Sequence, residues 1–188
     1  MSNERQTHTV QVAGLTRHFP LFEVAPGVRI AIVNILGDNE LVQAASKALA
    51  SLLADRHADV LITAESKSIP LAYDLSVAMK VPYVVLRKAY KPYMGNAIQA
   101  DTLSITTGAP QTLYLDEKDQ SLVKGHRVIL VDDVISTGST LQGMRVITDK
   151  AGGQVVGQAA IFTEGDRARW TEVIALGHLP VFVESGKH

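Results

Sequence analysis

Short apolar runs alternate along the chain with segments whose apolar residues recur at helical spacing. The runs are rich in β-branched residues and predict strands at residues 28–36, 60–63, 81–86, 127–131 and 154–162. The segments between them predict helices at residues 39–56, 70–80 and 139–150. Strands that are apolar throughout and alternate with helices are typical of a parallel sheet covered on both faces. The pattern therefore predicts one α/β domain, with a doubly wound, mostly parallel sheet, helices on both faces and a small N-terminal addition.

The remaining stretches carry turn-forming residues rather than a regular pattern. Pro20, Pro26 and Gly27 interrupt the N-terminal part, and Asn39 stands where the first helix needs an N-cap. Residues 89–112 are rich in Gly, Pro, Ser and Thr and predict a long loop. After residue 162 we expect a short tail with a surface helix around Trp170, whose side chain packs against the core.

Composition narrows the class of protein. The chain has 188 residues, of which 46% are hydrophobic and 5% aromatic, so we expect one domain with an aliphatic core. A net charge of −1 and the lack of a long basic run argue against nucleic acid or a membrane surface as partner. The sequence has no cysteine, which excludes disulfides and thiolate chemistry. No apolar run approaches the ~20 residues of a membrane span, and the N-terminus has no signal core, so we expect a soluble, cytoplasmic protein.

The segment 128–140 combines a buried strand with a polar turn. Four apolar residues lead into Asp132 and Asp133, and a small, hydroxyl-rich turn then opens a helix. Backbone N–H groups in such a turn can converge on a phosphate at the helix N-terminus, and Gly138 allows a positive φ. Carboxylates at the end of a strand can accept hydrogen bonds from vicinal hydroxyls. Because ligands of such sheets bind beyond the carboxyl ends of the strands, the segment predicts a site for ribose 5-phosphate.

Simpler interpretations exist for each part of this segment. The acid pair alone can be a solvated strand end, and the turn alone can be an ordinary N-cap. The complete string is much harder to explain in this way. The sequence contains no G-x-x-x-x-G-K-[ST] loop and no G-x-G-x-x-G turn after a strand, which argues against a P-loop nucleotidase and a dinucleotide-binding fold.

Several segments resemble type I phosphoribosyltransferases, the enzymes that use phosphoribosyl pyrophosphate (PRPP). Residues 128–140 are similar to the PRPP-binding motif, and residues 64–69 stand where the family has its pyrophosphate-binding loop, which often contains a non-proline cis peptide. Residues 85–92 resemble the Arg-Lys segment of adenine phosphoribosyltransferases, and residues 19–28 resemble their base-covering hood. The resemblance covers roughly residues 18–165. It implies the type I fold, with a hood formed by about residues 1–36 and a flexible lid at about residues 89–112.

The resemblance also implies a role for individual residues. Asp132 and Asp133 would hold the ribose hydroxyls, and with Lys88 they form the expected catalytic set. The 5′-phosphate would be bound by Ser136, Thr137, Gly138, Ser139 and Thr140. The pyrophosphate would be bound by Glu65, Ser66, Lys67, Ser68, Arg87 and Lys91, and the base by Val28, Arg29 and Ile30. Mg²⁺ would be held mainly by substrate oxygens and water, without a direct protein ligand.

The activity implied by the resemblance is the transfer of ribose 5-phosphate from PRPP to a purine, with adenine favoured, and the release of pyrophosphate. The family commonly forms homodimers and serves purine salvage. No protein nucleophile is needed, because positioning and charge stabilisation suffice for displacement at the sugar carbon. Closure of the lid would exclude water.

Two departures from the adenine enzymes leave alternatives open. Residues 29–32 lack the Arg-Asp pair of the family hood, and residues 109–112 lack an acid after Gly108. A xanthine phosphoribosyltransferase is therefore one alternative. A PRPP-binding sensor without catalysis is another, because residues 68–73 resemble purine-sensing transcription regulators. Those regulators carry an additional DNA-binding domain, for which we expect this chain to be too short.

Overall fold

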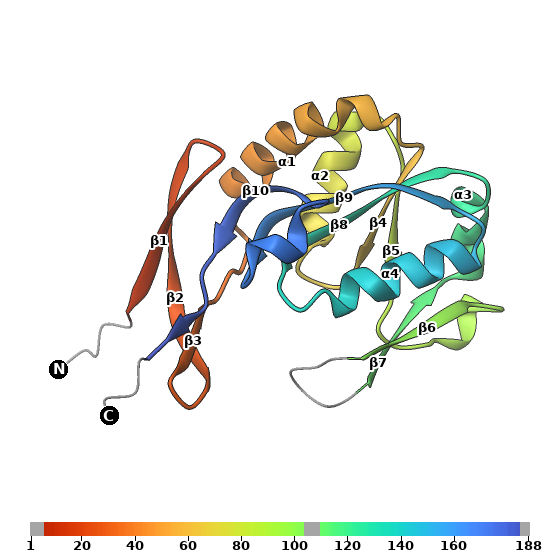
Figure 1. The fold of residues 1–188 in the computed structure, drawn as a ribbon. Coiled ribbons are helices and arrows are strands. Elements are labelled where there is room, and N and C mark those ends of the chain that lie inside the picture. Colours follow the sequence, from red (N-terminus) through yellow and green to blue (C-terminus); the bar gives the residue numbers. More distant parts are fainter. Residues whose placement is uncertain (1–5, 104–109, 185–188) are drawn as a thin grey trace.

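A five-stranded parallel sheet forms the centre of the molecule (Figure 1). The computed structural model describes residues 6–103 and 110–184. The strands follow the order β10-β9-β8-β4-β5, and all neighbouring pairs are parallel. Their bounds are β4 (Val60–Ala64), β5 (Tyr83–Leu86), β8 (Arg127–Ile135), β9 (Gln154–Glu164) and β10 (Ile174–Leu179). The predicted parallel sheet is confirmed.

Helices cover both faces of this sheet, as the apolar strands predict. Helices α1 (Asn39–Leu53) and α2 (Ile69–Met79) pack on one face, where strand β8 contributes Ile129 and Val131 to a buried cluster. Helix α4 (Ser139–Lys150) packs on the other face, where the alternate β8 residues Val128 and Leu130 are buried. Successive side chains of a strand point to opposite faces, so a strand between two helical layers must be apolar throughout. Two short elements follow other parts of the chain, η1 (Ala54–Arg56) after α1 and α3 (Gln120–Val123) before β8.

The N-terminal region forms an antiparallel sheet, which we call the hood, in the order β1-β2-β3-β11. Its strands are β1 (Thr7–Val12), β2 (Leu15–Ala25), β3 (Val28–Ala31) and β11 (Phe182–Val183). Pro20 lies inside β2 instead of interrupting it, and its carbonyl accepts the N–H of Ile32 at 2.9 Å. The strand expected at residues 28–36 ends at Ala31. Val33 and Ile35 are apolar because they are buried in the core and not because they belong to a strand.

Residues 89–112 do not form the continuous loop that we expected. They include the 3-10 helix η2 (Pro92–Met94) and most of an antiparallel pair, β6 (Ile98–Leu103) and β7 (Pro110–Leu115). Tyr114 in β7 exchanges backbone hydrogen bonds of 2.9 and 2.8 Å with Arg87, which ties the pair to the end of β5. The pair packs on α4 at Gly143, where a Cβ atom would collide with Thr102 Cγ2. Residues 104–109, which contain Gly108 of the expected lid, lie outside the described residues.

The C-terminal part is also more ordered than predicted. Strand β9 continues to Glu164, and β10 then adds a fifth parallel strand beside it. Strand β11 returns to the hood, where Val183 pairs with Val28. A 3-10 helix, η4 (Arg167–Trp170), occupies the place of the expected surface helix, and Trp170 packs against the α4 core. No helix in the described part of the chain is long and apolar enough to cross a membrane.

The hood is joined to the core by an ion pair that also caps a helix. Asp38 and not Asn39 is the N-cap of α1, because its Oδ1 accepts the Leu41 N–H at 3.1 Å. Arg17 in β2 donates to both oxygens of this carboxylate, at 2.7 and 2.9 Å, and reaches Glu40 at 2.8 Å. The hydrogen bonds from Arg17, more than the Leu41 N–H, lower the pKa of Asp38. One carboxylate therefore orders both the helix start and the hood strand.

Replacing Asp38 should separate these two roles. Asp38→Asn keeps an acceptor for the helix cap but loses the ion pair, so we expect a loss of about 1 kcal/mol in the free energy of unfolding. Asp38→Ala also loses the cap, and we expect a loss of about 2 kcal/mol. Because folding lowers this pKa, the wild-type advantage should be complete above the unfolded value near pH ~3.9 and disappear as the pH falls through the folded value. Urea unfolding between pH 3 and pH 7 would measure this, with the exposed Asp55→Asn as control. Equal stability of Asp38→Asn and wild type at pH 7 would contradict the ion-pair role.

Candidate active site at the carboxyl edge of the sheet

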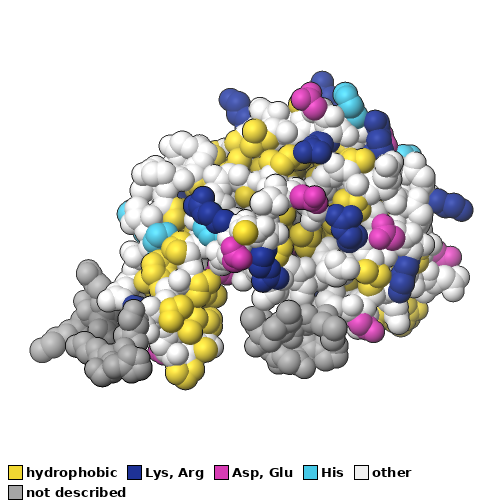
Figure 2. All heavy atoms as spheres, in the orientation of Figure 1, with side chains coloured by type: hydrophobic (Ala, Val, Ile, Leu, Met, Phe, Trp, Pro, Cys, Tyr) yellow, Lys and Arg dark blue, Asp and Glu magenta, His cyan; other side chains and the backbone are white. Residues whose placement is uncertain are grey.

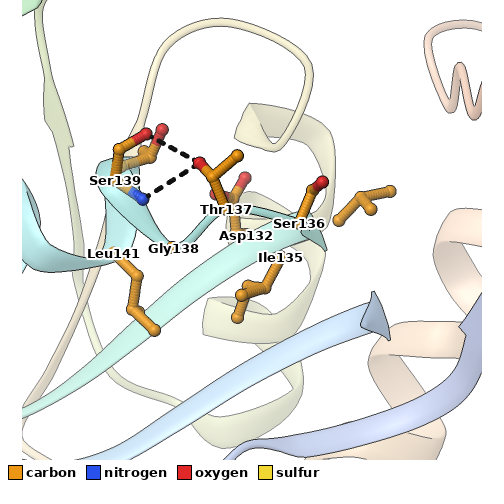
Figure 3. A pocket seen from close by; sticks show the side chains of 9 residues that line it. Asp132, Ile135, Ser136, Thr137, Gly138, Ser139 and Leu141 are labelled. Carbon is orange, nitrogen blue, oxygen red and sulfur yellow. Dashed lines mark hydrogen bonds between the residues drawn. The ribbon is translucent and has the colours of Figure 1, made fainter. Parts of the chain in front are cut away.

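The turn between β8 and α4 forms a small pocket of about 140 Å³ (Figure 3). Gly138 precedes the helix with a φ of 82°, a conformation that glycine adopts without steric cost. Thr137 Oγ1 lies 3.0 Å from Ser139 Oγ and accepts the Ser139 N–H at 3.3 Å. The N–H groups of Thr137, Gly138 and Thr140 have no protein acceptor among the described residues. The expected phosphate-binding residues are thus brought together around one pocket: Ser136, Thr137, Gly138, Ser139 and Thr140.

The acid pair stands at the wall of this pocket. Asp132 lines it, whereas Asp133 is buried beside it, with 7% of its surface exposed. Asp132 Oδ1 accepts the N–H of Asp133 at 2.9 Å, and Asp133 Oδ2 has no hydrogen-bond partner in the part of the chain that the structure describes. Burial and the neighbouring charge of Asp133 raise the pKa of Asp132, and the positive charge of Lys88 partly opposes this. The positive charge of Lys88 is therefore too weak to offset the effect of burial and of Asp133 on the pKa of Asp132.

The turn between β4 and α2 is the second polar segment at this edge. A cis peptide joins Glu65 and Ser66, as the resemblance implies. The N–H groups of Ser66, Lys67 and Ser68 have no protein acceptor within residues 6–103 and 110–184. The Lys67 ammonium donates to the Val33 carbonyl at 3.2 Å. This turn therefore presents free backbone donors, as a pyrophosphate site requires.

The Ser68 hydroxyl is occupied within the protein. It is buried and donates to the Ala64 carbonyl at 2.8 Å. Thr63 Oγ1 lies 2.7 Å from Ser68 Oγ and 2.8 Å from the Val131 carbonyl, and its single proton can serve only one of these acceptors at a time. These contacts shape the turn and join β4 to β8. A contact of Ser68 with pyrophosphate stays a prediction for its N–H group alone.

Glu65 supports the neighbouring basic segment. Its Oε2 accepts from Arg87 Nε at 2.7 Å, and its Oε1 accepts the Lys88 N–H at 2.6 Å. The hydrogen bond to Glu65 is also the main cause of the raised pKa of Arg87. This carboxylate is thus engaged at the end of β5, where it orients Arg87 and the backbone of Lys88. Direct contact between Glu65 and a ligand stays a prediction, and Lys91 is exposed nearby without a side-chain partner among the described residues.

The hood places the expected base-contact residues on two different faces. Ile30 pairs with Phe22, and Val28 pairs with Val183, so these four side chains share one face. Phe22 and Val183 are 54% and 67% exposed, and Figure 2 shows hydrophobic atoms gathered on this part of the molecule. Arg29 lies on the opposite face, where it bonds to Gln6 Oε1 and lies 3.5 Å from Glu184 Oε1. Sequence reasoning missed Phe22 and Val183, although the alternation in residues 21–25 marks Phe22 as a residue of one face.

Comparison with known proteins identifies the family of the chain. Residues 33–175 match the model of the phosphoribosyl transferase domain family. The chain belongs to this family. Among solved structures, adenine phosphoribosyltransferase from Rhodothermus marinus superposes with a TM-score of 0.65, at 22% identity over 92% of this chain and 94% of that one. The enzyme from Thermoanaerobacter pseudethanolicus gives 0.64 at 18% identity, over 92% and 95%. These structures confirm the type I phosphoribosyltransferase fold.

Curated relatives of this phosphoribosyltransferase domain include enzymes and regulators. The purine biosynthesis transcriptional repressor PurR of Bacillus subtilis is 31% identical over 71% of this chain and 46% of its own length. Hypoxanthine/guanine phosphoribosyltransferase of Methanococcus voltae is 35% identical over 60% of this chain and 56% of its own. Adenine phosphoribosyltransferase of Leuconostoc citreum is 29% identical over 72% and 75%. The chain spans about half the length of the first two relatives.

The acid pair predicts a distinct pH dependence of stability. The pKa of Asp132 is raised by burial first and by Asp133 second. The folded protein therefore binds this proton more tightly than the unfolded chain, and the resulting stability is lost as the pH rises through the folded value. Asp132→Asn should raise the free energy of unfolding at pH 8 by roughly 1–3 kcal/mol, and this difference should vanish near pH ~4. Urea unfolding across this range, with Asp55→Asn as control, measures it. A constant difference at all pH values would contradict the assignment.

Proposed function

We propose that this domain is a Mg²⁺-dependent purine phosphoribosyltransferase that transfers ribose 5-phosphate from PRPP to a purine, with adenine favoured, and releases pyrophosphate. The observation that carries the proposal is the 140 Å³ pocket in which the α4 N-terminus meets Asp132. A helix N-terminus with free N–H groups attracts a phosphate, and an adjacent carboxylate attracts sugar hydroxyls. One pocket thus combines the two chemistries of ribose 5-phosphate.

The two polar turns fit the two ends of PRPP. The turn at residues 136–140 would bind the 5′-phosphate through its N–H groups and hydroxyls. The free N–H groups of Ser66, Lys67 and Ser68 would bind the pyrophosphate, with positive charge from Arg87 and Lys88. Because β4 and β8 are adjacent and parallel, both turns leave the sheet at the same edge. Ribose bound between them would place its hydroxyls at Asp132 and Asp133.

Catalysis by these residues would consist of binding, orientation and charge stabilisation. Arg87 and Lys88 would stabilise the negative charge that develops on the departing pyrophosphate. Asp132, which lines the pocket, would accept hydrogen bonds from the ribose hydroxyls. Residues 89–112, which include β6 and part of β7, would close over the site and exclude water.

The donor set fits Mg²⁺ held largely through substrate and water. Among the described residues, no group of three or more His, Cys, Asp or Glu side chains is arranged to hold a metal ion. Asp133 Oδ2, which has no hydrogen-bond partner within residues 6–103 and 110–184, offers an acceptor beside Asp132. When bound, Mg²⁺ supplies positive charge to the pyrophosphate oxygens. The protein groups that would face it through water are the two carboxylates.

The exposed apolar face of the hood supports a planar base as acceptor. Val28 and Ile30 lie on this face together with Phe22 and Val183, and would contact the base by packing. The side chain of Arg29 is engaged with Gln6 and Glu184 on the other face, so it does not define the base by itself. Adenine is favoured because adenine phosphoribosyltransferase of Leuconostoc citreum is among the relatives, at 29% identity over 72% of this chain. Xanthine remains the alternative among the bases. A homodimer in the cytoplasm, acting in purine salvage, completes the proposal.

A PRPP sensor without catalysis is the second candidate. The observation that favours it is the 31% identity to the PurR repressor over 134 residues, which includes the region of residues 68–73 noted in the sequence. A sensor needs the same phosphate and ribose contacts but no base transfer. The two functions therefore differ in turnover and not in PRPP binding.

A two-step measurement tests the proposal and names the base. PRPP with Mg²⁺ should stabilise the protein by about 2.7 kcal/mol at a hundredfold excess over Kd, because it binds only the folded state. Separate additions of adenine, hypoxanthine, guanine and xanthine should then release pyrophosphate with one of them. The double variant Asp132→Asn, Asp133→Asn should lose this PRPP-induced shift, whereas Asp55→Asn should keep it.

The outcomes are distinct. Release of pyrophosphate with adenine supports the full proposal, and release with another base corrects the substrate. Binding of PRPP without turnover of any base supports the sensor. If folded wild-type protein shows no PRPP-induced shift, both functions are wrong.

A further inference from the structure

The short 3-10 helix η4 lies against the back of the phosphate turn, outside the pocket that would hold the ligand. Its last two residues, Arg169 and Trp170, both contact the turn at Thr137 and Gly138. Thr137 and Gly138 line both the 140 Å³ pocket and a second cavity of about 490 Å³, whereas Arg169 and Trp170 line only the second. The helix η4 therefore contacts the turn from outside the pocket that is expected to hold the phosphate.

Trp170 fits closely over the glycine of the turn. Its indole Nε1 donates to the Glu164 carbonyl at 3.0 Å, which holds the ring in place at the end of β9. A Cβ atom built on Gly138 would lie 2.7 Å from Trp170 Cη2, closer than such atoms approach in proteins. Gly138 thus has two reasons to lack a side chain: its positive φ and the ring above it. The indole limits how far the turn can move away from the pocket.

Arg169 holds a carbonyl group of the same turn. Its Nη2 donates to the Thr137 oxygen at 3.2 Å, and its guanidinium lies 5.0 Å from the centre of the Trp170 ring. In a planar trans peptide the carbonyl and the following N–H point in opposite directions. Because Arg169 holds the Thr137 carbonyl on its own side, the Gly138 N–H points away from Arg169. The positive charge of Arg169 also strengthens this hydrogen bond.

We propose that Arg169 and Trp170 are positioning residues that fix the peptide between Thr137 and Gly138, so that its N–H faces the 5′-phosphate. Neither side chain needs to touch the ligand. Without them, the peptide can rotate and the turn can relax, and the phosphate loses a preoriented donor. This inference rests on the proposed function, because it assigns a role at the same site. It predicts that substitution of these residues weakens binding of the 5′-phosphate end of the substrate and leaves binding of the pyrophosphate end unchanged.

The sequence offers a direct reporter, because the chain has a single tryptophan. Titration of wild-type protein with ribose 5-phosphate should change the fluorescence of Trp170, since the indole contacts the turn that binds this ligand. Arg169→Gln should weaken ribose 5-phosphate binding by about fivefold, the loss of one charge-assisted hydrogen bond. Binding of pyrophosphate, measured by calorimetry on the same protein, should stay within about twofold of wild type.

Two further variants serve as controls. Arg169→Lys keeps a charged donor but not the planar group that stacks on the indole, so it should restore part of the affinity. Arg167→Gln removes a cation from the same 3-10 helix, where no hydrogen bond to the turn exists among the described residues, and should bind both ligands as wild type does. Thermal melting confirms that each variant is folded.

A double-mutant cycle followed by thermal melting tests the contact between Trp170 and Gly138 in the absence of ligand. Gly138→Ala should lower the melting temperature in wild type through both its positive φ and the collision with Trp170. In a Trp170→Ala background only the first cost remains, so the same substitution should lower the melting temperature less. Equal losses in the two backgrounds would show that the contact does not constrain the turn.

The ligand results separate this inference from the proposed function. If wild type binds neither ribose 5-phosphate nor PRPP, the proposed function itself fails. If wild type binds both and Arg169→Gln retains full affinity for ribose 5-phosphate, the positioning role is wrong while the function stands. If Arg169→Gln weakens ribose 5-phosphate and pyrophosphate equally, the residue acts on general stability and the inference is overturned.

Discussion

The parallel pairing of β4 with β8 determines how the two polar turns of the candidate site lie relative to each other. Residues 60–62 pair in register with residues 128–130, and the Thr63 hydroxyl lies within hydrogen-bond distance of the Val131 carbonyl just beyond this pairing. Both strands therefore end at the same edge, and the turns that follow them start side by side. A shift of one residue in this register would displace one turn relative to the other by roughly 3.3 Å and take the Thr63 hydroxyl away from the Val131 carbonyl. The register of β4 and β8 therefore fixes the spacing of the two polar turns.

Many polar side chains at this edge of the sheet form hydrogen bonds with neighbouring protein groups and are therefore already engaged before a ligand binds. The carboxylate of Glu65 holds Arg87 and the Lys88 N–H, the Ser68 hydroxyl holds the Ala64 carbonyl, and Arg169 holds the Thr137 carbonyl. Within the described residues, the groups left free at this edge are mainly backbone N–H groups of the two turns. Backbone donors lose little conformational freedom on binding, so such a site is preorganised for anions. Polar side chains at a site are therefore not all ligand contacts.

The hood depends on the core in a different way. Its strands are antiparallel, and its inner face joins the core through residues such as Phe19, whose ring packs edge-on against Phe162 with centroids 5.6 Å apart. Arg17 adds a polar connection to the start of α1. The outer face near Val28 and Ile30 stays apolar and exposed, an unusual cost for a small sheet unless a ligand or partner covers it. The return of the C-terminal strand β11 completes this face, so both ends of the chain contribute to it.

The sequence by itself determined those elements of the structure that depend mainly on residues close together along the chain. Apolar runs and helical spacing predicted the central strands and helices, because each of these elements buries apolar side chains in the core. Helix α4 begins and ends where expected. The string from Val128 to Thr140 predicted the phosphate turn, since the strand, turn and helix start are contiguous. Only the tertiary structure decided which polar groups are free: Glu65 meets Arg87 from 22 residues away, and Arg169 reaches Thr137 across 32. It also decided that β10 and β11 form, because a short strand is stabilised by its partner strands and not by its own sequence.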